Sequence, residues 1–166
     1  MHRAALCVAF TALALHGCTA DCATEACDDF EKPHPTGSIQ TGIVGVVAYA
    51  TDVCENDCCE CTYSQTTLLV FETDTPVTDG TDAQARFAQM DPKHTLALDT
   101  RYAQPLDPGR YAACGPNLDT CANLEIADGQ VFTLNLKTLH GPMQMRVFDD
   151  SGTRQRDLVV GAGAPF

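Results

Sequence analysis

Apolar residues are distributed along this chain in two different ways, and the first is a single run near its start. Residues 4–15 contain no charged side chain, and Arg3 precedes them. A run of this length fits the apolar part of a secretion signal, whereas a helix that crosses a membrane needs about twenty residues. We therefore predict that residues 1–17 are a signal peptide that is removed and takes no part in the fold.

From residue 39 onward the apolar residues fall into short runs rich in β-branched side chains, which is typical of strands. Residues 42–50 and 67–73 are two such runs, and Gly45 within the first predicts a bulge or a close backbone approach. Further runs follow at residues 95–99, 101–103, 110–114, 122–127, 131–136 and 143–148. Seven or eight short strands at this spacing predict an all-β fold, an antiparallel, Greek-key-like sandwich.

Turn and helix signals lie between these runs. Residues 107–109 (Asp-Pro-Gly) predict a turn, because proline presets φ at its position and glycine accepts a positive φ. Residues 128–129 (Asp-Gly) predict a hairpin that joins the strands on either side. Residues 81–91 stay open between strand and one short helix, because Thr81 begins a capping-box pattern and Pro92 would stop a helix.

The segment between the signal and the first strand has no strand or helix period. Residues 18–38 are polar and acidic, and Pro33, Pro35 and Gly37 interrupt them. We predict that they form an acidic flexible tether, and that residues 39–166 form a single β-sandwich domain.

The end of the apolar run carries a more specific signal. Residues 15–18 (Leu-His-Gly-Cys) resemble the bacterial lipobox, in which a leucine and a small residue precede the cysteine that receives lipid. His16 departs from the small residue that is usual at its position. The resemblance implies cleavage before Cys18, acylation of Cys18, and a place in the cell envelope on the periplasmic or extracellular side. The alternative is ordinary cleavage after Ala20, which would give a secreted protein.

The chain has ten cysteines, and export explains their number. Cys7 would leave with the signal and Cys18 would carry lipid, which leaves an even number of thiols in an oxidising compartment. Disulfides are the default for such a set. The expected disulfide cysteines are Cys22, Cys27, Cys54, Cys58, Cys59, Cys61, Cys114 and Cys121. Pairing of Cys114 with Cys121 is favoured, because the two bracket a turn-rich connection between predicted strands.

The dense cysteine cluster at residues 54–61 has three interpretations. Its sulfurs would suit a soft metal such as zinc or copper(I). Cys58 and Cys61 also have the Cys-x-x-Cys spacing of redox sites. The favoured interpretation is a disulfide-knotted loop between the first two strands, bridged to Cys22 and Cys27, and no metal or cofactor.

Residues 140–145 add a second candidate for metal binding. They place one imidazole and two thioethers close together, as some periplasmic copper sites do. In a strand, however, Met143 and Met145 share a face with Val147, as core residues do. Core packing is the favoured interpretation. The alternative metal set would be Cys54, Cys58, Cys59, Cys61, His140, Met143 and Met145.

Charge and motif content exclude several functions. The formal net charge is −12, and no basic stripe appears along the sequence. Nucleic acid and anionic membrane surfaces are therefore poor partners, and the lipid anchor is the expected contact with the membrane. No serine or histidine of the mature chain stands in a nucleophile-elbow or metalloprotease motif, so we predict no enzyme.

Residues 99–102 and 106–111 carry a family resemblance. They resemble the carboxypeptidase regulatory-like, or transthyretin-like, β-sandwich family in its turn and its Leu-x-Pro-Gly-x-Tyr strand entry. Residues 42–47 match the family's opening strand. Thr100 stands where the family usually has glycine, and an extra segment follows the second strand. The resemblance implies an accessory fold with Tyr111 packed inward and its hydroxyl in water, used for adhesion, display or structure and without shared catalytic residues.

These patterns predict an exported, lipid-anchored, non-enzymatic envelope protein whose sandwich serves structural display or protein interaction. Two alternatives remain open. The domain would bind carbohydrate or another envelope polymer, with tyrosines replacing the absent tryptophan as stacking platforms. Those tyrosines are Tyr49, Tyr63, Tyr102 and Tyr111. Otherwise the protein would handle copper or zinc through the cysteine loop.

Overall fold

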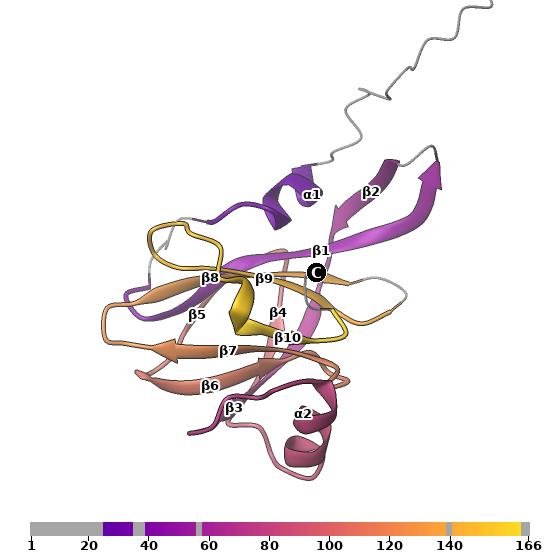
Figure 1. Ribbon diagram of the computed structural model, residues 1–166. Helices are drawn as coiled ribbons and strands as arrows, with labels where there is room; N and C mark the ends of the chain where they lie inside the picture. Colours follow the sequence, from indigo (N-terminus) through magenta and orange to yellow (C-terminus); the bar gives the residue numbers. More distant parts are fainter. Residues whose placement is uncertain (1–24, 35–38, 56–57, 139–140, 164–166) are drawn as a thin grey trace, which may run out of the picture.

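The computed structural model describes residues 25–34, 39–55, 58–138 and 141–163, and within residues 51–60 it describes the backbone alone. These residues form two five-stranded β-sheets packed face to face, with one short α-helix on the outside of each sheet (Figure 1). The prediction of an all-β sandwich is confirmed. The described residues form ten strands, more than the seven or eight that the hydrophobic runs predict.

The first sheet is organised around one long strand, β1 (Gly42–Glu55). One edge of β1 pairs with β5 (Arg101–Pro105) along its first half and with β2 (Cys58–Tyr63) along its second half. Its other edge pairs with β8 (Val131–Thr138), which pairs in turn with β9 (Gln144–Phe148). The β1–β8 pair is parallel, so the sheet is mixed and the prediction of a wholly antiparallel fold is wrong here.

The second sheet is antiparallel throughout, in the order β10-β7-β6-β3-β4. Its strands are β3 (Thr66–Glu72), β4 (His94–Leu98), β6 (Gly109–Cys114), β7 (Thr120–Ile126) and β10 (Val159–Gly161). A single 3₁₀ turn, η1 (Arg156–Leu158), leads into β10.

The main core lies between the two sheets, where alternate residues of every long strand point inward. Its fully buried members include Ile43, Val47, Leu68, Val70, Leu134, Leu136 and Met145. The intervening residues on β1, β6 and β8 are also buried, because a helix or the N-terminal segment covers their outer face. This double burial explains why these runs are continuously apolar and show little alternation.

Helix α2 (Gly80–Phe87) covers the outer face of the second sheet and resolves the ambiguity at residues 81–91 in favour of a helix. It begins two residues earlier than the capping-box pattern indicates. Asp79, in place of Thr81, is the N-cap: its carboxylate accepts from the amide of Asp82 at 2.9 Å. Phe87 stacks on Phe71 of β3, with ring centroids 4.3 Å apart, and fastens the helix to the sheet.

Two connections differ from the sequence predictions. Residues 128–129 join β7 to β8, but these strands belong to different sheets, so the predicted hairpin is wrong and the turn carries the chain across the sandwich. Residues 25–34, predicted as part of a flexible tether, form helix α1 (Glu25–Phe30) and a segment packed on the first sheet. The domain therefore begins before residue 39.

The backbone approaches Gly45 closely, as the sequence predicts. A Cβ at this position would lie 2.3 Å from the carbonyl oxygen of Leu134 on β8, so only glycine fits here. Tyr102, paired with Gly45 in register, donates its hydroxyl to the same Leu134 carbonyl. The irregularity of β1 itself lies further along, between Ala50 and Cys54.

Tyr111 packs inward, but its hydroxyl does not stay in water. The residue is 1% exposed, and its hydroxyl donates to the carbonyl of Asp107 at 2.9 Å. The bond ties the start of β6 to the 107–109 turn, so the Tyr111 hydroxyl serves to hold this turn and is not directed into water.

Candidate functional site

The N-terminal helix is too short to be stable alone and depends on its contacts with the first sheet. Ala26 and Phe30 lie four residues apart, on one face of α1, and both are buried. They pack against the small outward-facing residues Ala48 and Ala50 of β1. Alanines at these positions leave room for the helix to approach the strand.

Asn135 of β8 holds the end of α1 on the sheet. Its side chain is fully buried, and its Nδ2 donates to the carbonyls of Asp29, Phe30 and Lys32 at 3.0, 3.0 and 2.7 Å. Its Oδ1 accepts from the amide of Val46 at 3.2 Å. The two hydrogens of this amide are therefore shared among three carbonyls at the end of α1, and the Asp29 carbonyl also accepts from the amide of Lys32 at 3.3 Å.

The segment after α1 continues along the same strand. The amide of His34 donates to Thr133 Oγ1 at 3.1 Å, and the Thr133 hydroxyl donates to the carbonyl of His34 at 3.2 Å. Thr133 and Asn135 are both buried polar residues on the outer face of β8. Burying them is tolerated because the N-terminal segment supplies their partners.

A disulfide adds a covalent link between α1 and the sheet. Cys27 of α1 bonds Cys61 of β2, and the bond joins residues 34 apart in sequence. Cys61 is buried beside Ala26 and Phe30. The expected bridge from the N-terminal segment to the cysteine-rich loop is therefore present for this pair.

A polar cluster at the exposed side of α1 joins the helix to β2 and β5. The Tyr63 hydroxyl donates to Asp29 Oδ2 at 2.6 Å, and Arg101 Nη2 donates to the same carboxylate oxygen and to the Tyr63 oxygen. Glu25 accepts from Arg101 at 3.4 Å. Burial, and then the hydrogen bond to the Asp29 carboxylate, raise the pKa of the Tyr63 phenol to about 12.

This cluster predicts a late tyrosine ionisation. Since the pKa of Tyr63 in the folded state lies above the ordinary 10.0, the stability it contributes is present below pH 10.0 and is lost as the pH rises through about 12. Ultraviolet absorbance of tyrosinate should show one step near pH 12 that Tyr63→Phe removes. Tyr49→Phe is the control and should leave that step in place. A Tyr63→Phe curve that keeps the step would show that another phenol produces it.

Three basic residues, Lys137, Arg146 and Arg154, contact Phe30 or Glu31, and Arg156 follows Arg154 two residues later on η1. We call these four the cation cluster. Glu31 lies among them, with its carboxylate oxygen 3.4 Å from Arg146 Nε and 3.5 Å from Arg154 Nη1. The ring of Phe30 lies under two of the cations, 4.5 Å from Lys137 Nζ and 4.8 Å from the Arg146 guanidinium carbon.

Burial and the neighbouring positive charges lower the pKa values of two members of the cation cluster. Burial lowers the pKa of the Lys137 ammonium, and Arg146 lowers it further, against an opposite effect of Glu31. Burial also lowers the pKa of the Arg154 guanidinium, and Arg146 and Arg156 add to that effect. One carboxylate therefore faces several cations, and the cluster keeps a positive excess.

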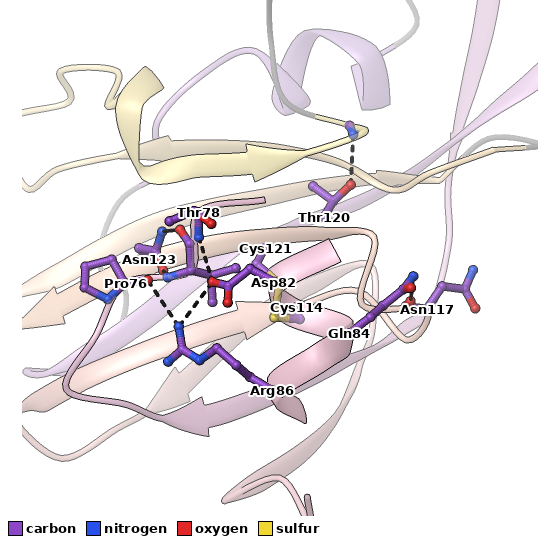
Figure 2. Close-up of a disulfide and its surroundings, with 12 residues drawn as sticks. Pro76, Thr78, Asp82, Gln84, Arg86, Cys114, Asn117, Thr120, Cys121 and Asn123 are labelled. Carbon is purple, nitrogen blue, oxygen red and sulfur yellow. Dashed lines mark hydrogen bonds and ion pairs between the residues drawn. A yellow bond between two sulfur atoms is a disulfide. The ribbon is translucent and has the colours of Figure 1, made fainter. Parts of the chain in front are cut away.

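The opposite end of the molecule is stapled in a different way. Cys114 and Cys121, directly opposed on β6 and β7, form the disulfide that the sequence favours, under helix α2 (Figure 2). Arg86 of α2 reaches back to the segment before the helix and donates to the carbonyls of Thr75 and Pro76 at 2.8 and 3.2 Å. These bonds position α2 over the disulfide.

Asn123 of β7 also holds the segment that precedes α2. Its side chain accepts from the amide of Val77 and donates to the carbonyl of Val77, both at 2.8 Å. A hollow of about 350 Å³ lies beside it, lined in part by Asp74, Arg110 and Glu125. Arg110 and Glu125 pair with each other at 3.2 Å. Three of the polar residues that line the hollow, Asn123, Arg110 and Glu125, therefore already have partners.

The predicted metal set is only partly within the described residues. His140 and the side chains of Cys54, Cys58 and Cys59 lie outside them, as does Cys22, whereas Cys61 bonds Cys27. Met143 and Met145 are buried in the core between the sheets, 5% and 0% exposed. Within the described ranges, no three His, Cys, Asp or Glu side chains gather as a metal site.

Three of the four tyrosines proposed as stacking platforms are packed in the fold or hydrogen-bonded within it. Tyr111 is buried, Tyr102 is packed on the core with its hydroxyl bonded to Leu134, and Tyr63 bonds Asp29. Tyr49 is half-buried on β1. Substituting Tyr102 or Tyr111 would therefore test the core of the fold more than any glycan site.

The residues that define the α1 face were not found from the sequence. Asn135 is one polar residue in an apolar run, and Phe30 is one large apolar residue in a polar segment. The four members of the cation cluster are spread over residues 137–156. The one available signal was Asn135 within a strongly apolar strand, since a polar residue there requires buried partners.

The chain matches no protein-family model, no curated protein and no solved structure. The resemblance to the carboxypeptidase regulatory-like family therefore stays a prediction. In the part of the chain that the structure describes, no helix has the length and apolar character needed to cross a membrane.

Proposed function

We propose that this protein is exported and lipid-anchored at Cys18, and that its sandwich serves structural display or protein interaction in the cell envelope without catalysing a reaction. The observation that carries the proposal is the pair of disulfides: Cys27–Cys61 joins α1 to β2, and Cys114–Cys121 lies under α2. Disulfides of this structural kind persist in oxidising compartments and are rare in the cytosol. They support the export that residues 1–17 predict.

The start of the folded domain also supports an anchored protein. Seven Cα–Cα steps separate Cys18 from Glu25 in the sequence, and an extended chain spans at most about 3.6 Å per residue, so the reach is about 25 Å. Helix α1 then continues directly onto the first sheet. A lipid on Cys18 would hold the domain close to the membrane surface.

The use of polar side chains supports a non-enzymatic role. Asn135, Asn123 and Arg86 are each engaged with backbone groups, and each holds one segment of the chain on another. Side chains used in this way hold the fold together. We therefore assign the domain to binding or display through its outer surface.

Intact mass of the exported protein, before and after reduction, tests the proposal. Cleavage before Cys18, a lipid increment and a mass gain on reduction are expected. Cys18→Ser should lose the lipid increment. Cys7→Ser is the matched control, because Cys7 leaves with the signal, and it should behave as the wild type. An uncleaved, fully reduced protein inside the cell would overturn the proposal.

A further inference from the structure

Four of the chain's ten Lys and Arg residues lie in the cation cluster, although the chain as a whole carries a net charge of −12. Lys137 and Arg146 both lie over the ring of Phe30, so they are within about one Debye length of each other at physiological ionic strength. Charges on the far side of the domain are screened over longer distances. Arg156 is exposed and Arg154 is partly exposed, so an approaching anion meets these two first, whereas the Arg146 side chain is only 14% exposed.

The other acids of α1 pair with bases outside the cluster: Asp28 pairs with Lys32, and Glu25 and Asp29 pair with Arg101. Glu31 is shared by Arg146 and Arg154 and compensates one charge. The carboxylate of Asp149, at the end of β9, accepts from its own loop, from Ser151 and Thr153. Those hydrogen bonds lower the pKa of Asp149, and no cation of the cluster is among their causes. Asp157 stands beside Arg156 on η1 and is the nearest remaining acid in sequence.

The position of the cluster relative to the anchor indicates what it meets. On the proposed function, on which this inference rests, the acyl chain is attached seven residues before α1. Helix α1 ends at Phe30, whose ring Lys137 and Arg146 contact. The chain enters the described domain at Glu25, and the cluster lies at the other end of the six-residue helix, about 9 Å further on. The short reach from Cys18 therefore keeps this face near the surface of the leaflet.

We propose that the cation cluster docks the domain on the anionic headgroups of the leaflet that carries the lipid anchor. Arg and Lys side chains bind phosphate oxygens through charge-assisted hydrogen bonds. A single acyl chain gives only marginal attachment, and a basic surface supplies the second signal. The expectation that anionic membranes are poor partners rested on the linear sequence, in which the four bases are separated.

Docking through this face also fixes which surface points away from the membrane. Helix α2 lies on the opposite side of the sandwich from α1 (Figure 1). The α2 side would therefore be presented to soluble partners, with Asp79 and Asp82 at its helix start.

Vesicle binding by the unacylated Cys18→Ser protein tests the proposal without the anchor. It should bind phosphatidylcholine vesicles that contain phosphatidylglycerol, bind pure phosphatidylcholine vesicles much less, and lose binding at high salt. Each basic residue at a membrane surface changes binding about fivefold. Arg154→Glu/Arg156→Glu should therefore weaken binding by well over tenfold.

Matched variants separate a local effect from net charge and from unfolding. Lys93→Glu/Arg110→Glu makes the same change in net charge on the second sheet and should change binding little. Glu31→Gln removes the carboxylate of the cluster and should strengthen binding, which a damaged fold would not do. Equal losses in the two double variants, or no binding to either vesicle, would overturn the proposal. Acylation of the wild-type protein is read from its mass, so failure of docking and failure of anchoring are distinguishable.

Discussion

Replacing Asn135 by leucine is expected to lower the free energy of unfolding by about 4 kcal/mol. Leucine has a similar size but neither donates nor accepts. The carbonyls of Phe30 and Lys32 and the amide of Val46 would lose their side-chain partner in a buried place, whereas the Asp29 carbonyl would keep the amide of Lys32. Leaving a buried polar group unpaired costs about 1–3 kcal/mol. The total is smaller than the sum over these groups, because the N-terminal segment can move away and expose its carbonyls to water.

Denaturant unfolding of the oxidised protein, followed by far-ultraviolet circular dichroism, measures the effect. Asn117→Leu is the matched control, because Asn117 is exposed in the loop between β6 and β7, and it should change stability little. A loss below about 1 kcal/mol for Asn135→Leu would show that water replaces the amide, and that Asn135 does not hold α1.

Removing the Cys27–Cys61 disulfide, as Cys27→Ala/Cys61→Ala, is expected to cost about 3.8 kcal/mol through the entropy of the unfolded chain. The two cysteines are 34 residues apart in sequence. The cysteines of the control Cys114→Ala/Cys121→Ala are 7 residues apart, and their bond should contribute less, about 2.4 kcal/mol. The informative result is which double variant loses more unfolding free energy, because both values come from the same loop-entropy calculation.

Hydrogen exchange adds a local measurement to this comparison. Without the Cys27–Cys61 bond, the amides of α1 should exchange faster, because only the non-covalent contacts of Asn135, Phe30 and Asp29 then hold the helix. Amides of β6 and β7 should be affected only in the control variant. Equal stability losses, or unchanged exchange in α1, would contradict a role for this bond in fastening the helix.

Sequence patterns predicted the sandwich because burial dictates which residues are apolar. Residues 42–50 and 67–73 are apolar on both faces, and both became interior strands, β1 and β3. Met143 and Met145 share a face with Val147, and that face is the core, as the period of two predicts. These features follow from local spacing and needed no knowledge of distant contacts.

The features that were missed depend on contacts between distant segments. The Asp-Gly turn at residues 128–129 reverses the chain locally, but nothing in it says which sheet the next strand joins. Residues 25–30 are too few to show a helical period, and the polar composition of the segment concealed Phe30. The cation cluster forms because β8, β9 and the 154–156 segment lie side by side in space.

The Cys27–Cys61 bond also has a mechanical consequence. A pull on a lipid-anchored N-terminus would enter the folded domain at Cys27 and pass through the two sulfurs to β2. The chain between these cysteines, including all of β1, would then stay out of the line of force. Tension from the envelope would load the β1–β2 pairing as a unit and would not strip β1 from β8 one residue at a time.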